Sequence, residues 1–377
     1  MKQVITTERI PIKLWLDDID DGALEQAKNL ANLPFAYKHI AIMPDSHQGY
    51  GMPIGGVLAT DGVIVPNAVG VDIGCGMTAV KTDLTYITAD QIKSFVEGIR
   101  ERVPVGFAHH QDDQEWDGFD EALDIQIIQQ ELSSARKQLG TLGGGNHFIE
   151  IQQGDDGAIW VMIHSGSRNF GLKIANHFRK QAEALCTRWY SDIPTKELSF
   201  LPVDTREGSD YYKAMNYCLK FAEASRSRMM MAVLDVMSAN AEIYLDVHHN
   251  YAVLENHFNK NVIVHRKGAI SARDGEFGII PGSMGTFSYI IVGNGNPESF
   301  KSCSHGAGRR MGRKEAGRVL NLDVEREKMS GIVHGLRTEA DLDEAPGAYK
   351  PIDAVMENQS DLVSILVELR PLGNIKG

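Results

Sequence analysis

One short stretch of the sequence combines a potentially reactive side chain with groups that bind phosphate. In KSCSHGAGRRMGR, from Lys301 to Arg313, His305 precedes a Gly-Ala-Gly turn and three arginines follow it closely. Glycine lets the backbone approach a phosphorylated ligand, and arginine binds phosphate through paired hydrogen bonds. Two interpretations are open: an ordinary basic loop leading into a helix, or a phosphate-binding loop in which the His305 imidazole reacts.

A second set of residues has the chemistry of metal ligands and lies at the ends of apolar runs. The set is Asp72 and Cys75 in GVDIGCGM, His147 in GGGNHFIE, His164 in VMIHSGSR, and His248 and His249 in LDVHHNY. Mixed oxygen, sulfur and nitrogen donors suit borderline divalent ions such as Mn, Zn or Co. Asp72 and Cys75 share one glycine-flanked turn, close enough to serve adjacent ions, and a thiolate can bridge two of them. Each residue alone is more often structural, but together they predict a metal site in a cleft.

The remaining histidines are weaker candidates. Four lack glycine or polar companions and are predicted to be surface or core residues: His39, His177, His257 and His334. His109 and His110 lie in the polar stretch GFAHHQDDQEWDGFD and are predicted to face solvent. For His47, which follows Asp45 in a glycine-rich loop, a structural role and a role beside ligands or substrate are both open.

Composition limits the class of protein. The chain has 377 residues, of which 43% are apolar and 23% charged, as in globular proteins. Its net charge of −12 argues against indiscriminate nucleic-acid binding, which needs Lys and Arg to neutralise phosphates, but leaves room for a local basic groove. Four widely spaced cysteines fit a reducing compartment. No apolar run is long enough to span a membrane and the N-terminus carries no signal-like stretch, so a cytoplasmic location is expected.

Periodicity predicts helices and strands scattered irregularly along the chain. Helices are expected at Asp21–Leu33, Thr88–Arg102, Asp120–Leu139, Leu172–Trp189, Tyr211–Ser238 and Asp353–Leu369. Strands are expected in HIAIMPD, VLATDGVIV, MTAVKTDL, HFIEIQ, AIWVMIHS, EIYLDVHH, NVIVHRK and SYIIVG. Without repeats or a linker, this order favours an α+β fold in one domain over residues 1–377.

The motifs together resemble the RtcB family of RNA ligases. They are, in chain order, HIAIMPDSHQGYGMPIGGV, GVDIGCGM, LGGGNHFIE, HSGSR, HHNY, RKGA, IIPGSMGT, SCSHGAGR and IKG. The resemblance covers essentially the whole chain. It implies one large RtcB-like domain, with mixed β-sheets surrounded by helices and a central metal and GTP cleft.

The resemblance also implies an activity. The family joins an RNA 3′-phosphate or 2′,3′-cyclic phosphate to a 5′-hydroxyl, using GTP as cosubstrate and two Mn(II) ions. His305 matches the histidine that forms a covalent histidine–GMP intermediate, from which GMP passes to the RNA 3′-phosphate to give an activated RNA-3′-pp-5′-G end. A neutral imidazole is a competent nucleophile toward phosphorus, which makes this assignment chemically reasonable.

Site residues carry over by position. Asp72, Cys75, His147, His164 and His249 match the metal ligands, with Cys75 bridging and His248 a neighbour only. The guanylate pocket is matched by Asn146, Glu150, Asn250, Ser283, Ser288, Gly306, Ala307, Gly308, Arg309, Tyr349 and Lys376, and RNA phosphate contacts by Arg168, Lys267 and Arg313. Glu150 is the acid expected to select guanine, because a carboxylate can accept from both guanine N1–H and the exocyclic amine.

Some positions depart from the family pattern, and other activities need weighing. Ser46, Asn169, Phe170 and Gly312 differ from the expected residues, and Phe170 is expected to alter the RNA-facing rim beside Arg168. A metal-dependent phosphohydrolase would use the same metal cluster, but it would not need His305 in a GTP pocket. A purely RNA-binding module would need a basic or aromatic surface. A monomer is expected, and an archease-type activator is a candidate partner.

Overall fold

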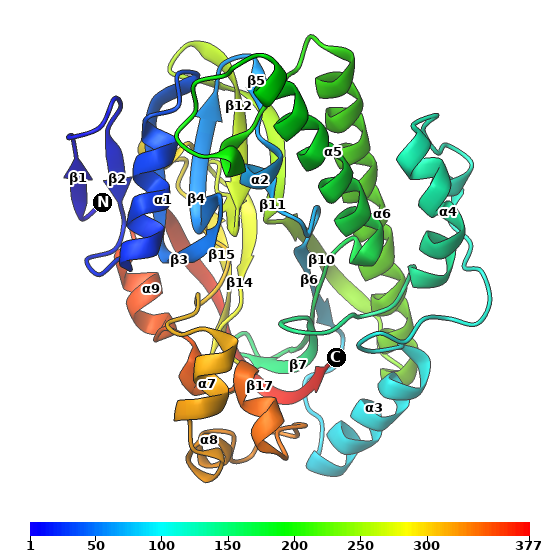
Figure 1. Ribbon diagram of the computed structural model, residues 1–377. Helices are drawn as coiled ribbons and strands as arrows, with labels where there is room; N and C mark the ends of the chain where they lie inside the picture. The colour runs from blue at the N-terminus through cyan, green and yellow to red at the C-terminus, as the bar shows by residue number, and fades with distance from the viewer.

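The computed structural model describes all residues, Met1–Gly377, and consists of two sheets with helices around them (Figure 1). The first sheet has the strand order β1 (Gln3–Ile5), β2 (Ile12–Leu14), β3 (Ala36–Tyr50), β4 (Met52–Thr60), β12 (Lys260–Lys267), β11 (Asn250–His257). The second has the order β10 (Ala241–His248), β6 (Gly76–Thr82), β8 (Ile159–Ser165), β7 (Phe148–Gly154), β17 (Val363–Lys376), β15 (Ser288–Gly293), β14 (Phe277–Ile280). Its edge strands β10 and β14 contact each other, so this sheet curls nearly into a barrel.

Two small antiparallel pairs complete the strands: β5 (Val63–Ile64) with β9 (Leu201–Pro202), and β13 (Ala269–Ser271) with β16 (Ser302–Ser304). The helices are α1 (Asp21–Ala31), α2 (Pro66–Val69), α3 (Ala89–Arg102), α4 (Gln126–Gln138), α5 (Arg168–Arg188), α6 (Arg206–Met237), α7 (Arg313–Val319), α8 (Leu322–Lys328) and α9 (Ile352–Asn358). Helices and mixed sheets interleave along the chain, which confirms the α+β class.

Strand alternation gives the curled sheet two different faces. On β7, Ile149 and Ile151 point outward and pack in the core formed with α3 and α6. Phe148, on the same strand, points to the other side and packs with Trp160 and Met162 of β8 inside the curl. Because successive strand side chains alternate, Glu150 lies on the same face as Phe148 and also points into the interior of the curled sheet.

Local signals explain the long helices that cover the sheets. Helix α6 begins where Thr205 Oγ1 accepts the Gly208 N–H at 3.1 Å and ends at Ser238, which is in the left-handed region with φ 50°. Helix α3 begins with a capping box between Thr88 and Gln91. No helix in the structure has both the length and the apolar character that crossing a membrane requires.

One predicted helix is wrong. Asp353–Leu369 was expected to be a single helix, but the structure has the short helix α9 at Ile352–Asn358 and then strand β17 at Val363–Lys376. The physical reason is pairing: β17 lies between β7 and β15 and completes both ladders, which a helix there would leave open. The other predicted helices are present, although α4 begins later and α5 and α6 earlier than expected.

Candidate active site

Strand register gathers the chemistry-bearing residues at one end of the curled sheet. His164 lies opposite both Met77 of β6 and Phe148 of β7. Cys75 directly precedes β6, and His147 directly precedes β7. His249 follows β10, whose last residue pairs with the first residue of β6. The strand ends that the sequence separates by many residues therefore meet at one place.

The five expected ligands form one contiguous cluster around the Cys75 sulfur. Cys75 Sγ is 3.5 Å from His147 Nε2 and 3.2 Å from His164 Nε2. On one side, His147 Nε2 is 3.2 Å from Asp72 Oδ2. On the other, His164 Nε2 is 3.4 Å from His249 Nε2. The distances thus divide the cluster into Asp72, Cys75 and His147, and Cys75, His164 and His249, with the sulfur common to both groups.

Backbone carbonyls orient two of the imidazoles. His147 Nδ1 is 3.0 Å from Leu142 O, and His164 Nδ1 is 3.0 Å from Asn146 O. Since a carbonyl oxygen only accepts, each Nδ1 carries the proton and each Nε2 presents a bare lone pair to the cluster. The Nε2 lone pairs of His147 and His164 both face the Cys75 sulfur, so the cluster holds more acceptors than donors. In addition, His249 Nδ1 is buried without a hydrogen-bond partner. Divalent cations would satisfy this donor set, so the residues fit a metal centre.

Burial and neighbouring groups shift the acidity of these residues. Burial, with His147 and His305 nearby, lowers the pKa of His164 well below its ordinary value. Burial and the Asp72 charge raise the pKa of the Cys75 thiol well above its ordinary value. Burial alone would raise the pKa of Asp72, but the adjacent His147 ring lowers it. Burial likewise lowers the pKa of His249, so the His164 and His249 imidazoles are held neutral, which is the form that binds metal.

His305 lies beside this cluster, with one ring nitrogen held by a carboxylate. Its Nδ1 is 2.6 Å from Asp45 Oδ2, which also accepts the His305 backbone N–H at 3.1 Å. Asp45 Oδ2 thus holds the Nδ1 side of the ring, and Nε2 is the ring nitrogen that Asp45 leaves unengaged. The His305 ring centroid is 4.7 Å from that of His249. His305 therefore stands as an oriented imidazole beside the candidate metal ligands.

The glycine-rich loop after His305 packs closely on strand β3. Gly308 has φ +73°, and a Cβ there would lie 2.1 Å from the Asp45 carbonyl oxygen. Only glycine fits such a contact with this backbone conformation. The loop is thereby fixed next to Asp45, the residue that holds the His305 ring.

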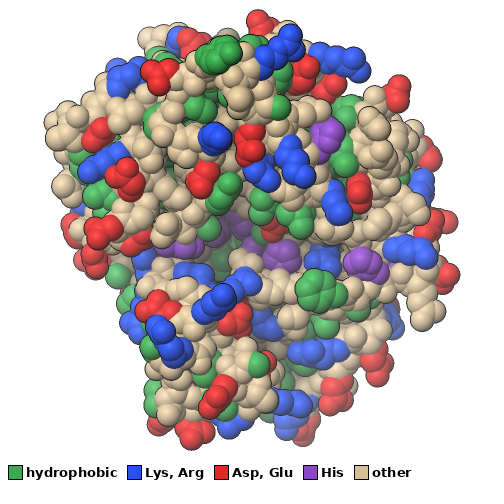
Figure 2. Space-filling model, viewed as in Figure 1, with side chains coloured by type: hydrophobic (Ala, Val, Ile, Leu, Met, Phe, Trp, Pro, Cys, Tyr) green, Lys and Arg blue, Asp and Glu red, His purple; other side chains and the backbone are tan.

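A cavity of about 760 Å³ opens in front of His305. Figure 2 shows histidines at the bottom of a hollow across this face, with Lys and Arg along its margins. The expected guanylate residues all line the cavity except Ser288, which is buried in β15 and accepts the Gly282 N–H at 3.1 Å. Asn250 lines it, but both ends of its amide are engaged, with Asp72 O at 3.1 Å and Gly268 N at 3.0 Å.

Two of the acidic residues that line this cavity, Glu150 and Glu344, differ in their surroundings. Glu150 accepts hydrogen bonds from Asn374 at 2.8 Å and Gln152 at 2.5 Å, and burial raises its pKa to about 7. Glu344 was not predicted from the sequence. It receives Arg309 at 3.1 Å, Arg313 at 3.3 Å, Lys376 at 3.4 Å and the Tyr349 hydroxyl. These four partners were all expected site residues. The only feature of the sequence that could have pointed to Glu344 is its position shortly before Tyr349.

The expected RNA-contacting residues differ in their surroundings. Arg168, at the start of α5, donates from Nε to Thr141 Oγ1 at 2.9 Å and from Nη2 to Gly106 O at 3.0 Å. Lys267 lines the cavity, but its Nζ donates to Tyr50 O at 2.6 Å and Asn67 O at 3.0 Å. Burial lowers the Lys267 pKa to about 7. Arg313 has a half-exposed side chain at the cavity margin.

The positions that depart from the family pattern lie away from the ligands. Phe170 was expected from the sequence to alter the RNA-facing rim, and this expectation is wrong. Its side chain is buried with 1% exposure and packs on Tyr217 and Phe221 of α6. Ser46 is buried and its hydroxyl has no partner. Asn169 and Gly312 are exposed.

Three further histidines lie outside the cluster of candidate metal ligands. His248 turns away from the cluster, with Nδ1 3.3 Å from both Gly74 O and Arg226 Nη2. His47 lines the cavity, and its Nδ1 is 3.1 Å from Asp45 O. His109 is exposed, as expected. All four cysteines are free, in agreement with the absence of a disulfide framework.

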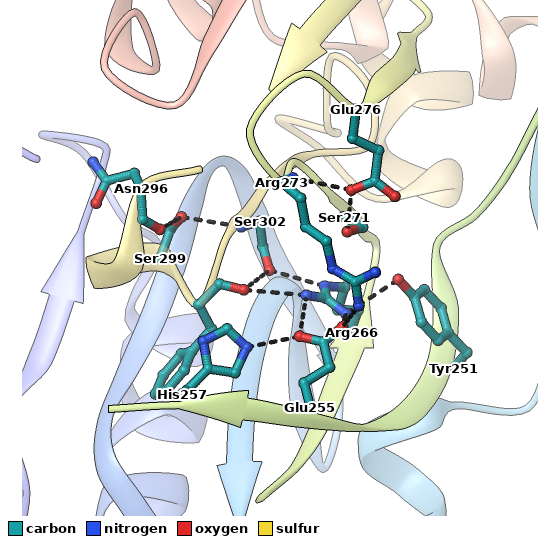
Figure 3. A network of polar contacts seen from close by, with 11 residues as sticks. Tyr251, Glu255, His257, Arg266, Ser271, Arg273, Glu276, Asn296, Ser299 and Ser302 are labelled. Atoms are coloured by element: carbon teal, nitrogen blue, oxygen red, sulfur yellow. Dashed lines mark hydrogen bonds and ion pairs between the residues drawn. The ribbon is translucent and has the colours of Figure 1, made fainter. Parts of the chain in front are cut away.

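A buried ionic network lies behind β16, the strand that ends just before His305 (Figure 3). Arg266 is fully buried on β12 and donates from Nε to Ser302 Oγ at 2.9 Å, three residues before His305. Its two terminal nitrogens donate to Glu255 at 2.9 and 3.1 Å. Glu255 also accepts from Arg273 at 2.8 Å. Strand β16 is thereby tied to the first sheet through charged groups.

Comparison with known proteins identifies the family. The sequence matches the family described as tRNA-splicing ligase RtcB over residues 26–126 and 115–377. It is 37% identical to the RNA-splicing ligase RtcB of Escherichia coli (strain K12), over 100% of this chain and 99% of that protein. It is 34% identical to the tRNA-splicing ligases RtcB of Thermococcus kodakarensis and Pyrobaculum aerophilum, over 98% of this chain and 95% of each.

The α+β fold, the thiolate and imidazole cluster and these relatives define an enzyme of the RNA ligase class. The chain belongs to the RtcB family. The resemblance found in the motifs is thus confirmed over the whole sequence.

Proposed function

We propose that this protein is a GTP- and Mn(II)-dependent RNA ligase that joins a 3′-phosphate or 2′,3′-cyclic phosphate end to a 5′-hydroxyl end. The observation that carries the proposal is the position of His305. Its Nδ1 is held by Asp45, while its ring stands against His249 at the edge of the Cys75 cluster. A metal-dependent phosphohydrolase would use the cluster but would not need an oriented imidazole nucleophile.

In the first step, His305 Nε2 attacks the α-phosphorus of GTP. The new N–P bond forms as the bond from the α-phosphorus to the bridging oxygen breaks, and pyrophosphate leaves. The Nδ1 proton stays on the ring, where Asp45 stabilises the positive charge that develops. An oxygen of the RNA 3′-phosphate then attacks the same phosphorus, which returns the imidazole and leaves GMP on the RNA end. The 5′-hydroxyl oxygen of the second RNA finally attacks the RNA 3′-phosphorus, so that the phosphodiester bond forms as the bond to GMP breaks, and the hydroxyl proton passes to water. A 2′,3′-cyclic end first takes up water, which opens the ring to the 3′-phosphate used in these steps.

The metal ligands would be Asp72, Cys75, His147, His164 and His249, with Cys75 shared by two ions. Bound divalent ions would polarise phosphoryl oxygens and offset their charge. Carbonyls of Leu142 and Asn146 keep two of the imidazoles aligned for this role. The S, N and O donors are compatible with Mn(II), and zinc should compete for them.

The rest of the cavity would hold the nucleotide and the RNA. The guanylate residues named above, apart from Ser288, line it, and Glu150 is proposed to read guanine with Lys376 nearby. Arg168, Lys267 and Arg313 are proposed to contact RNA phosphates. Lys267 uses two of its three N–H donors on carbonyls, which leaves one for a phosphate. An archease-type activator and a monomeric state belong to the same proposal.

Covalent labelling tests the proposal. The protein is incubated with Mn(II) and GTP radiolabelled at the α-phosphate, and label is followed on a denaturing gel. Wild type should retain label, His305→Ala should not, and His177→Ala on α5, away from the cavity, should behave as wild type. His305→Ala should still join RNA that carries a pre-activated 3′ end. Wild-type protein without label would exclude the histidine–GMP route, and hydrolysis of phosphate ends without joining would favour the phosphohydrolase.

A further inference from the structure

An aromatic side chain stands fully exposed in the segment that follows helix α3. Phe107 has a relative exposure of 102%, the highest of the exposed large hydrophobic residues. Its ring therefore contributes nothing to the core. A large apolar ring that packs on nothing in the protein is a candidate contact for a ligand.

The backbone around Phe107 is held in place by hydrogen bonds on both sides. Gly106 N donates to Gly143 O at 2.8 Å, and Leu142 N donates to Pro104 O at 2.9 Å. Beyond the ring, Ala108 N donates to Val105 O at 3.1 Å. Because these bonds fix the turn, the backbone that carries the ring loses little conformational entropy when a ligand packs on Phe107.

The same contacts connect Phe107 to the metal cluster. Gly143 and Leu142 belong to the glycine-rich segment before His147, and the Leu142 carbonyl accepts from His147 Nδ1. Arg168 bridges the two segments, since it donates to Gly106 O and to Thr141. Hydrogen bonds therefore link the turn that carries Phe107 to the segment that ends at His147, and the Arg168 guanidinium donates to the residue just before Phe107.

The surroundings of the ring favour a nucleic acid over a protein partner. Its exposed neighbours Ala108, His109 and Gly144 are small or polar, so no broad apolar patch of the kind that docks proteins is formed. His109 adds a second ring, and partial burial with the Arg168 charge lowers its pKa below the ordinary value, which keeps it neutral near pH 7. Flat rings beside a basic side chain are the usual elements of a single-stranded nucleic-acid site.

We propose that Phe107 is a stacking platform for a nucleobase of the RNA strand that enters the cleft on the His147 side, with Arg168 next to it for the adjoining phosphate. This inference rests on the proposed function and names a substrate contact outside the catalytic cavity. Stacking is tolerant of base identity because every base has a π face. The contact would therefore position RNA near its end without selecting a sequence.

The test measures RNA binding separately from chemistry. Fluorescently labelled single-stranded RNAs are used in two arms, one ending in a 3′-phosphate and one beginning with a 5′-hydroxyl, in the presence of Mn(II). Phe107→Ala should weaken binding about 10-fold in one arm, the order expected for one lost base stack, and Phe107→Trp should restore it. Tyr190→Ala removes a ring of 93% exposure at the end of α5 and serves as the matched control.

Abasic substitutions locate the stacked base. At one position near the RNA end, an abasic nucleotide should weaken binding to wild type but should cost Phe107→Ala almost nothing further. Equal binding by wild type and Phe107→Ala in both arms would overturn the proposal, as would additive losses at every abasic position. A change in the sedimentation of Phe107→Ala without RNA would instead indicate a protein interface and also overturn it.

Failure of the proposed function would look different. In that case wild-type protein would not become labelled by GTP, whereas the binding comparison between Phe107 and its variants could still be read. Guanylylation needs no RNA, so its rate in Phe107→Ala also shows whether the fold and the cavity survive the substitution.

Discussion

The carboxylate of Asp45 should control how fast His305 reacts. Asp45 is fully buried on β3, and one of its oxygens, Oδ2, meets both the His305 ring at 2.6 Å and the His305 backbone N–H at 3.1 Å. Asp45→Asn keeps the shape of this side chain but removes its charge. The amide oxygen must take the place of Oδ2, because an amide N–H there would face two donors. Guanylylation should become slower, while metal content and the apparent affinity for GTP stay near wild type.

The magnitude follows from what the substitution removes. A hydrogen bond to a charged group contributes roughly 1.5 to 3 kcal/mol, against about 1 kcal/mol for a neutral one. The positive charge that develops on the imidazole during attack also loses its counter-charge. A loss of about 1.4 to 3 kcal/mol corresponds to a rate decrease of roughly 10- to 150-fold. The amide nitrogen would in addition occupy the place of Oδ1, which is buried and has no partner, and stability should fall by about 1 to 3 kcal/mol.

Rapid-quench measurement of the first turnover with labelled GTP and Mn(II) gives the rate directly. Ser46→Ala is the matched control, because it removes the neighbouring buried hydroxyl, which has no hydrogen-bond partner. Denaturant unfolding of both variants separates the stability effect from the rate effect. A wild-type guanylylation rate in Asp45→Asn would refute the reasoning that this carboxylate orients the nucleophile.

Three further outcomes are expected. Cys75→Ala should lose more than one equivalent of metal by elemental analysis, since its sulfur is common to both ligand groups; two bound ions in the variant would contradict bridging. Lys376→Ala should weaken GTP use and the preference for GTP over ATP in steady-state guanylylation, with metal content unchanged, because Lys376 lies in the cavity beside Glu344. Burial lowers the pKa of His265 to about 4, so the folded state protonates this imidazole at a lower pH than the unfolded state does. The stability that neutral His265 gives above about pH 6.5 should therefore decrease by about 2 kcal/mol between pH 7 and pH 5, and His265→Asn should show a correspondingly smaller pH dependence in urea unfolding.

Much of the site could be predicted from the sequence because its residues lie in short, unusual local patterns. A cysteine between glycines and histidines at the ends of apolar runs identify themselves without knowledge of the fold. Register then brings them together, since the first residue of β6 pairs with the last residues of β8 and β10. The sequence alone could not supply this register, because strand partners far apart in the chain leave no local signal.

The failures have the same origin. The segment after Asp353 has a helix-like apolar spacing, but pairing with β7 and β15 decides that Val363–Lys376 is a strand. This strand also positions the end of the chain. Lys376 reaches the cavity as the last residue of β17, and not on a loose tail after a helix. Phe170 was interpreted from the nearby Arg168, yet helical residues two positions apart point in different directions, and Phe170 packs into the core.

The network in Figure 3 holds the strand before His305 through charged groups, in addition to the apolar packing of Cys303. Buried ion pairs add little net stability, because desolvation offsets most of their attraction. Hydrogen-bonded ion pairs have a direction that apolar contacts lack. The planar Arg266 guanidinium donates to Ser302 and to the Phe300 carbonyl, while Glu255 accepts from it and fixes its orientation. The start of β16 is therefore fixed in position and orientation. Asp45 fixes the residue just beyond its end, so the nucleophile is held from two sides by groups that specify direction.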